Sequence, residues 1–326
     1  MRDKRAPVTL DAAIEKFLAH QRTFGRNYSF AEYMLRALRR FVARQGAPDL
    51  SASIFERWCK AQQHLSPNTR YGRQLLVRKL CLFRQRNEPG CFVPDPSNFA
   101  RPRPRTPPVI VTRPQVAALL RAADELAPSP YNPLRPAVIR IAIILLYTAG
   151  LRRGEVVRLQ LGDVDARHGV LHIRQSKFHK SRWVPLSRDA IRDLCCYLRR
   201  RLRKPYDLQP GAPLLCNASR CYGHIGWHAY TGASLRRELS TLFERAGVCD
   251  AQGRRPCVQD MRHSFAVEAL SRCYRAGGDV QTHLPKLALY MGHVSIVSTA
   301  YYLHFIPEVA ALASARFGRR FSHLID

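Results

Sequence analysis

The chain has 326 residues, 46% of them hydrophobic, which is enough to bury more than one core and excludes an intrinsically disordered tail. It carries 53 lysines and arginines against 24 aspartates and glutamates, so its net charge is +29. A folded body this basic repels itself unless a polyanion neutralises it, and we therefore expect a nucleic acid partner. The alternative is a general bias toward arginine, which would raise the charge without any such partner.

Neither the N-terminus nor the most apolar stretch has the pattern of a targeting or membrane segment. The start, "MRDKRAPVTLDAAIEKF", is charged but lacks the apolar region of a signal peptide. The stretch "AVIRIAIILLYTAG" (137–150) contains Arg140 and is shorter than the ~20 residues that cross a bilayer. We expect a buried helix there, no membrane association, and a cytoplasmic, nucleoid-associated protein.

Four helices are predicted in the first part of the chain. Apolar residues recur at helical spacing, with arginines between them and turn residues at the ends, over 10–25, 30–46, 51–63 and 66–87. Such a set is typical of a small helical domain that grips DNA, and equally of a generic bundle with solvated arginines. We assign residues 1–93 to this domain.

A proline-rich segment separates this domain from the rest. Residues 94–111, "PDPSNFARPRPRTPPVIV", show no helical periodicity, and prolines keep such a segment extended and semi-rigid. Thr112 then has Gln115 three residues on, which is a helix-start signature before an apolar run. We expect a linker over 94–111 and a second domain over 112–326.

The second domain is predicted to be mostly helical, with one β-hairpin. Residues 169–186 alternate in short segments on either side of a polar turn, and this turn carries Lys177 and Lys180. Further helices are expected at roughly 188–204, 233–246, 262–275, 284–291 and 307–317. The predicted fold class is therefore mostly α with a small β-hairpin or sheet.

The ten cysteines show no regular spacing and are expected to be free thiols. One group, "CNASRCYGHIGWH", offers four zinc-ligand types: Cys216, Cys221, His224 and His228. Zinc sites usually have closer cysteine pairs, two to four residues apart. We interpret the segment as a glycine-containing surface loop and predict no metal site.

Five short motifs follow one another in the second domain: "TAGLRRGE" (148–155), "SKFHKSRWVPL" (176–186), "VQDMRHSF" (258–265), "MGH" (291–293) and "TAYYLH" (299–304). In this order they resemble the tyrosine recombinases of the phage-integrase family, which includes Xer-type and transposon-borne enzymes. The resemblance extends over about 108–317, and the first part of the chain matches the family only in architecture.

The resemblance implies two arginines that clamp the scissile phosphate. Phosphodiester cleavage without a metal needs fixed cationic donors, because negative charge grows on the non-bridging oxygens in the transition state. Arginine suits this role since its planar fork stays charged and bonds two oxygens at once. Arg152 and Arg262 match the two family arginines, and Glu155 matches an acidic position that orients the first. Arg153, beside Arg152, is interpreted as a surface residue.

The remaining motif positions suggest the acid and the nucleophile. Lys177 matches the hairpin lysine that protonates the leaving 5′-oxygen, although Lys180 lies close enough to be confused with it. His293 matches a histidine that hydrogen-bonds the phosphate. The family nucleophile lies nine residues beyond it, which selects Tyr302 and not Tyr301.

One position departs from the family pattern. Where the family has the histidine of H-x-x-R, this chain has Gln259, which can hydrogen-bond but cannot exchange a proton near neutral pH. We expect Gln259 to donate a hydrogen bond to the phosphate without taking part in proton transfer. His263 is expected to point about 100° away from Arg262 around its helix, and not to substitute for the missing histidine.

The resemblance implies a site-specific recombinase or integrase of a mobile element, which forms a 3′-phosphotyrosyl link and needs neither cofactor nor metal. Its partner would be double-stranded DNA with inverted half-sites, bound by a dimer that synapses into a tetramer, with or without partner recombinases. The segment 307–317 would be exchanged between neighbours. Two alternatives remain: a type IB topoisomerase-like enzyme, and a DNA-binding protein of recombinase ancestry that has lost catalysis.

Overall fold

The computed structural model describes residues 9–25, 28–104, 106–174, 181–203, 206–221 and 224–306. The chain forms two compact units, Met1–Thr106 and Pro107–Asp326. Both are built mainly from helices, and the described β-structure is limited to two small antiparallel sheets. This confirms the predicted fold class. Among the described residues, no helix has both the length and the apolar character needed to cross a membrane.

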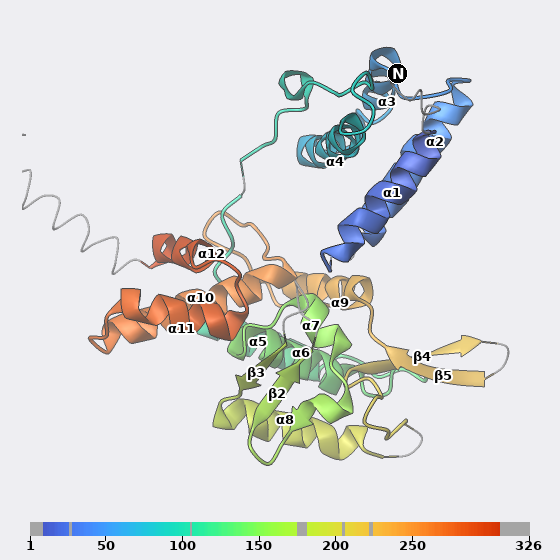
Figure 1. Ribbon diagram of the computed structural model, residues 1–326. Coiled ribbons are helices and arrows are strands. Elements are labelled where there is room, and N and C mark those ends of the chain that lie inside the picture. The colour runs from blue at the N-terminus through green and yellow to red at the C-terminus, as the bar shows by residue number, and fades with distance from the viewer. Residues whose placement is uncertain are drawn as a thin grey trace, which may run out of the picture. The chain divides into compact units, whose positions relative to one another are not determined.

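The first unit consists of four helices, and all four predicted helices are present (Figure 1). They are α1 (Leu10–Thr23), α2 (Ser29–Arg44), α3 (Ala52–Lys60) and α4 (Pro67–Gln85). Hydroxyl side chains of Thr9, Ser51 and Ser66 accept hydrogen bonds at the starts of α1, α3 and α4. The apolar faces enclose one core, which includes Phe17, Leu35, Leu38, Trp58 and Leu80.

A buried charge lies beside this core. The Arg84 side chain is only 4% exposed, and it donates to the carboxylates of Asp49 at 2.8 Å and Glu88 at 2.9 Å. The hydrogen bond to Asp49 raises the pKa of Arg84 above its ordinary value despite the burial. Two carboxylates thus neutralise this cation inside the first unit.

The proline-rich segment 94–111 contains the point where one unit gives way to the other. A short 3-10 turn, η1 (Pro96–Asn98), precedes Phe99, whose ring belongs to the core of the first unit. Val111 is buried in the second unit, and its backbone N–H donates to Ser264 Oγ at 2.8 Å. Each end of the segment is therefore packed into a different unit.

The second unit is organised around α6 (Arg135–Thr148), a helix that is buried along most of its length (Figure 1). Apolar residues occur on all sides of α6, as expected for a helix surrounded by others. It contacts α5 (Arg113–Asp124), α8 (Arg188–Arg201), α9 (Gly232–Arg245) and α10 (Val258–Arg275). The predicted buried helix over 137–150 is thus the centre of this unit.

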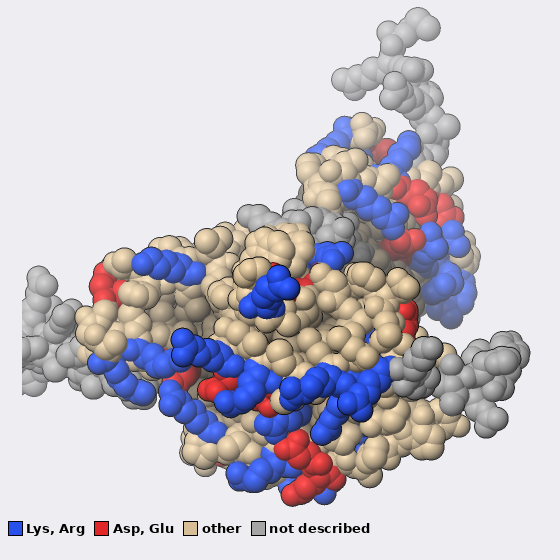
Figure 2. Space-filling model, turned by 90° about the horizontal axis from the view of Figure 1, so that it is seen from below, with Lys and Arg blue, Asp and Glu red and all other residues tan. Residues whose placement is uncertain are grey.

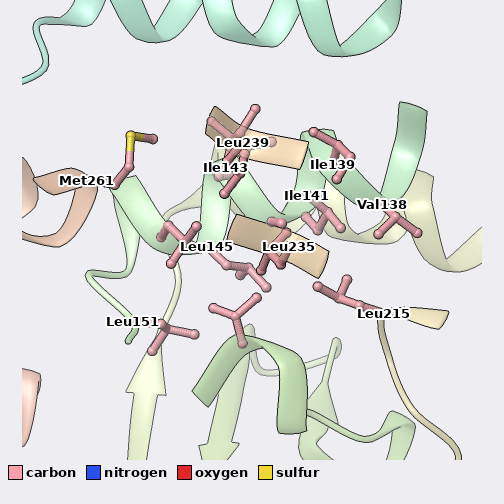
Figure 3. Close-up of a cluster of buried hydrophobic side chains, with 14 of the residues drawn as sticks. Val138, Ile139, Ile141, Ile143, Leu145, Leu151, Leu215, Leu235, Leu239 and Met261 are labelled. Carbon is pink, nitrogen blue, oxygen red and sulfur yellow. The ribbon is translucent and has the colours of Figure 1, made fainter. Parts of the chain in front are cut away.

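The core around α6 also fixes two site residues. Figure 3 shows Leu151 and Met261 in one cluster with Ile143 and Leu145, and all four side chains are 0% exposed. Leu151 and Met261 directly precede Arg152 and Arg262 in the sequence. Burying the first residue of each pair anchors the backbone from which the arginine projects.

A three-stranded antiparallel sheet lies beside this helical core, with strand order β1-β2-β3. Its strands are β1 (Val164–Asp165), β2 (Val170–Ile173) and β3 (Arg182–Pro185), and Ile173 pairs with Arg182. The pairing of β2 with β3 confirms the predicted hairpin. The predicted acid Lys177 and its neighbour Lys180 lie outside the described residues, as does all of 175–180.

The interpretation of residues 216–228 as a loop was wrong. They form a second hairpin, β4 (Cys216–Cys221) with β5 (His224–Ala229), in which His228 pairs with Asn217. Since neighbouring residues of a strand face opposite ways, Cys216 and His228 lie on opposite faces. Cys216 and His228 are therefore not placed to bind the same metal ion.

The last described part of the chain packs on α10. It contains α11 (Val280–Met291), α12 (Val297–Ala300) and the 3-10 helix η4 (Tyr301–Phe305). A small core of its own includes Phe265, Leu270, Met291, Tyr302 and Ile306. The predicted exchange helix 307–317 lies outside the described residues.

Candidate active site

Arg152 is placed by a tight helix end. Gly150 ends α6 with φ +59°, and a Cβ at this position would lie 2.3 Å from the Phe265 ring, so glycine is needed twice over. Arg152 then opens α7 (Arg153–Arg158), and its guanidinium donates to Glu155 Oε1 and to the carbonyl of Gly292, both at 2.8 Å. Arg153 is exposed, in agreement with its interpretation as a surface residue.

Glu155 holds two arginines and not one. Its side chain is buried and accepts from Arg152 and also from Arg182, with Arg182 Nη1 and Nη2 at 3.0 and 2.9 Å from its two oxygens. Burial alone would raise the pKa of this carboxyl. The hydrogen bonds and charges of Arg182 and Arg152 instead lower it to about 2. Glu155 is therefore fully ionised near neutral pH and orients both guanidinium groups.

Arg182 was missed by the sequence analysis. It lies in β3 and also donates through Nε to the carbonyl of Tyr290 at 2.8 Å, which ties the sheet to α11. The available signal was the strand alternation: Arg182 falls on the same face as buried Val184, and exposed Trp183 falls on the other. An arginine on the buried face of a strand needs a carboxylate partner, and Glu155 supplies it.

Arg262 is more deeply buried than Arg152 and Arg182, and only 1% of it is exposed. Its guanidinium donates to the carbonyl of Gly150 and to that of Met291, the latter at 2.7 Å. Burial and the neighbouring Arg152 lower its pKa to about 10, so it remains charged at neutral pH. Two of its five N–H donors are used in these bonds.

His293 follows the left-handed Gly292, which ends α11 at φ +68°. The His293 Nδ1 lies 2.7 Å from Thr299 Oγ1, and Thr299 itself is completely buried. Burial together with Arg262 and Arg152 lowers the pKa of His293 to about 4. The ring is therefore neutral at pH 7 and fixed in orientation by Thr299.

Tyr302 and Tyr301 differ as the nine-residue offset suggested. Tyr302 is 2% exposed and its ring stacks on that of His293 with centroids 6.1 Å apart, whereas Tyr301 is 40% exposed. Burial raises the pKa of the Tyr302 phenol above its ordinary value, although Arg262 and Arg152 oppose this. The phenol thus needs a base if it is to react near neutral pH.

His263 lies beside the candidate nucleophile, a contact that the sequence analysis did not predict. His263 Nδ1 lies 3.0 Å from the Tyr302 hydroxyl, within hydrogen-bond distance. The 100° between neighbouring helix positions does separate His263 from Arg262, but η4 packs against the face of α10 on which His263 lies. Gln259, by contrast, is exposed in the first turn of α10.

The structure therefore brings together Arg152, Glu155, Arg262, His293 and Tyr302 from three separate stretches of the sequence, 152–155, 262 and 293–302, and it adds Arg182 and His263. Cations gather around a buried phenol, which is an arrangement suited to nucleophilic attack on an anion. Surface charge alone is less specific. Figure 2 shows lysines and arginines in a band across one face of the second unit, with acidic side chains among them.

The sequence comparisons agree on one family. The model of the phage integrase family matches residues 110–308. The protein y4rB of Sinorhizobium fredii, named provisionally as an integrase/recombinase, is 32% identical over 317 residues, covering 96% of this chain and 98% of y4rB. The tyrosine recombinase XerD of Mycobacterium tuberculosis is 32% identical over 228 residues, or 66% of this chain and 65% of XerD.

Solved structures show the same fold. The XerH site-specific recombinase, in a post-cleavage complex with palindromic difH substrate, matches with a TM-score of 0.63 and 19% identity over 94% of this chain and 84% of XerH. The Tn1549 transposon integrase, in complex with transposon right end DNA, gives a TM-score of 0.62 and 18% identity over 94% of this chain and 99% of the integrase.

Proposed function

This chain belongs to the phage integrase family and is a tyrosine recombinase, and from that premise we propose that Tyr302 is its DNA-cleaving nucleophile. The observation that carries the proposal is the burial of Tyr302, at 2% exposure, with its hydroxyl 3.0 Å from His263 Nδ1 and its ring stacked on that of His293. The charges of Arg262 and Arg152 also act to lower the pKa of this phenol. Tyr301, by contrast, is 40% exposed.

The two arginines would hold the scissile phosphate. Carbonyl oxygens of Gly150, Met291 and Gly292 fix both guanidinium groups, so their remaining N–H donors are oriented before DNA arrives. Donors fixed in this way stabilise the charge that develops on the phosphate oxygens. His293, neutral and held by Thr299, and Gln259, exposed in the first turn of α10, would serve as further hydrogen-bond donors to the phosphate.

The proposed reaction conserves the phosphodiester energy. The Tyr302 oxygen bonds to phosphorus, the bond from phosphorus to the 5′-oxygen breaks, and a general acid gives that oxygen a proton. By its motif position Lys177 is the acid. A 5′-hydroxyl from a partner strand then attacks the 3′-phosphotyrosyl link and releases Tyr302, so the strands are rejoined without an external energy source.

We further propose that the protein acts in pairs on inverted half-sites of double-stranded DNA, and that two pairs meet in a tetramer. The likeness to XerH, whose structure contains a palindromic substrate, supports this arrangement. A mobile element is the proposed context, because the Tn1549 integrase shares the fold and was solved with transposon DNA.

The test starts from DNA of unknown sequence. The protein is mixed with nicked duplexes that carry a randomised segment, since a nick lets the cleaved fragment diffuse away and traps the covalent adduct. Adducts that survive denaturant are sequenced, which yields the preferred duplex for all later assays. We expect an inverted repeat, an adduct in wild type and in Tyr301→Phe, and none in Tyr302→Phe although DNA binding persists.

The alternatives predict other outcomes. An adduct that persists in Tyr302→Phe would refute the nucleophile. A wild-type protein that binds DNA and forms no adduct would be a recombinase-like binding protein. Adducts at unrelated sequences, together with relaxation of supercoiled plasmid by the monomer, would indicate the topoisomerase-like alternative.

A further inference from the structure

The Tyr302 hydroxyl contacts a titratable side chain, that of His263, to which the family motif assigns no catalytic role. His263 Nδ1, from α10, lies 3.0 Å from the phenol oxygen, and the two rings lie 5.4 Å apart at an angle of 54°. This is the distance at which a phenol donates a hydrogen bond to an imidazole nitrogen. A base already in contact with the nucleophile is the geometry that proton transfer requires.

Other candidate side chains are poor proton acceptors. Gln259, at the position of the family histidine, is an exposed amide and cannot take a proton near neutral pH. His293 stacks on the Tyr302 ring, and its Nδ1 contacts Thr299 instead of the phenol. Arg152 and Arg262 are cations and have no lone pair to offer. Among the described side chains around Tyr302, His263 is the one with both the chemistry and the contact.

The surroundings of His263 keep it ready to accept. Asp260 and Arg262 on its own helix act on it in opposite directions, and Tyr302 and His293 face it from the segments packed against α10. Burial is the largest influence and lowers the pKa of His263 below its ordinary 6.5. The ring is therefore neutral at pH 7, and with its proton on Nε2 it leaves Nδ1 free to accept.

We propose that His263 is the general base that takes the Tyr302 proton during DNA cleavage, in place of the histidine that Gln259 replaces. The O–H bond of Tyr302 breaks and an N–H bond forms at His263 Nδ1 while the phenolate oxygen attacks phosphorus. In rejoining, the imidazolium returns this proton to the departing phenolate. This inference rests on the proposed role of Tyr302 as the nucleophile.

Two variants separate proton transfer from hydrogen bonding. In His263→Asn the amide oxygen replaces Nδ1 as an acceptor but cannot take a proton, whereas His263→Ala removes both functions. Single-turnover cleavage of the selected nicked duplex should fall about 10²-fold or more in both variants, which is the scale for a lost general base. His283→Asn, which removes an exposed histidine of α11, is the matched control and should cleave at the wild-type rate.

The pH profile gives a second readout. A base must be unprotonated, so wild-type cleavage should decline as pH falls through the pKa of His263, below 6.5. This decline should be absent in His263→Asn. His293 does not imitate it, because its pKa is about 4 and its protonation comes only in more acidic solution.

A duplex with sulfur in place of the scissile 5′-oxygen shows whether His263 activates Tyr302 or protonates the leaving group. Sulfur leaves as a thiolate and needs no acid, so Lys177→Ala should recover on this substrate if Lys177 is the acid. His263→Asn should stay about 10²-fold slow, because activation of Tyr302 is unchanged. Recovery of His263→Asn on sulfur would mean that His263 serves the leaving group, and would overturn the proposal.

Two further outcomes would also overturn it. If His263→Asn cleaved at the wild-type rate while His263→Ala was slow, the hydrogen bond alone would suffice. If both variants matched wild type, the contact would have no role in catalysis. A wild-type protein that formed no adduct on either duplex would instead contradict the proposed function, so the two failures remain distinct.

Discussion

Two buried arginines, one in each unit, show how differently the same side chain is used. Arg84 in the first unit is 4% exposed and is bound by the carboxylates of Asp49 and Glu88. Arg262 in the second unit is 1% exposed, and its hydrogen bonds go to backbone carbonyls. The pKa of Arg84 is raised, whereas that of Arg262 is lowered to about 10.

The difference follows from what neutralises each charge. Carboxylates cancel the charge of Arg84, which makes it a structural cation. Carbonyl dipoles accept two hydrogen bonds from Arg262 without cancelling its charge, and burial and the neighbouring Arg152 outweigh the opposing influence of Glu155 on its pKa. Burying a cation whose charge is only partly offset is unfavourable unless an anion arrives, and in this protein the expected anion is a DNA phosphate. A buried arginine whose charge is only partly neutralised thus indicates an anion-binding site more clearly than surface charge does.

The largest expected effect comes from exchanging each arginine for alanine. Arg262→Ala should slow adduct formation by about 10²–10³-fold, the scale for one lost transition-state donor, with a much smaller loss of DNA affinity. Arg84→Ala should leave the cleavage rate of folded protein unchanged but lower the free energy of unfolding by about 2–3 kcal/mol, since it leaves two carboxylates unpaired. Single-turnover cleavage and urea unfolding measure the two effects, and equal losses of binding and cleavage in Arg262→Ala would make it an ordinary phosphate contact.

A second test removes the carboxylate of Glu155, which binds Arg152 and Arg182 in the candidate site. Glu155→Gln should lower the free energy of unfolding at pH 7 by about 3 kcal/mol, estimated from a carboxyl pKa lowered from 4.5 to about 2. Because the folded pKa is below the unfolded one, this stabilisation is present above pH 4.5 and is lost as pH falls toward 2. Urea unfolding of both proteins across this range should show the difference shrinking, and a constant difference would contradict the ion-pair explanation.

Arg182→Lys tests geometry at constant charge. Lysine keeps the cation but lacks the planar fork that reaches both Glu155 oxygens and the Tyr290 carbonyl. Arg152 should then be held less firmly, and cleavage should fall by about 10-fold, equivalent to ~1.4 kcal/mol. The exposed Arg153→Lys is the control, measured in the same cleavage assay. An unchanged rate in Arg182→Lys would show that charge alone maintains the site.

Gln259 should give the smallest effect, because it is neutral and exposed. Gln259→Ala removes at most one hydrogen bond to the phosphate, which is worth about 0.5–1.5 kcal/mol, or roughly 2- to 10-fold in rate. Gln259→His should be tolerated and should introduce a second pH dependence near an imidazole pKa of about 6.5. Cleavage rates across the neutral pH range test both variants. A loss of rate in Gln259→Ala as large as that in Arg262→Ala would contradict the idea that the buried cation contributes more to cleavage than the exposed amide.

The helical parts of the fold were predictable because their signals are local. Apolar spacing and turn residues located the first four helices, and its apolar run identified α6 as a buried helix. The β4–β5 hairpin was missed because "CNASRCYGHIGWH" combines glycines with residues suited to loops and metal sites, and its alternation is weak. Its pairing depends on contacts that form only in the folded chain.

The candidate site likewise contains residues that local sequence motifs suggested and residues that only the folded structure reveals. Motif order and the nine-residue offset were enough to select Arg152, Arg262, His293 and Tyr302. The contact between His263 and Tyr302 joins residues 39 positions apart and depends on how η4 packs on α10, which no local pattern encodes. Arg182 likewise acts through Glu155, and this ion pair exists only because β3 lies next to α7.

The carbonyl bonds of Arg152 and Arg262 also have a consequence for conformational entropy. A free arginine side chain loses up to about 2 kcal/mol of rotamer freedom when it is immobilised. Here Gly150, Met291 and Gly292 impose that loss when the chain folds. In the proposed reaction, DNA would therefore meet two guanidinium groups that are already ordered, and the entropic cost of aligning them would weaken neither its binding nor the passage to the transition state.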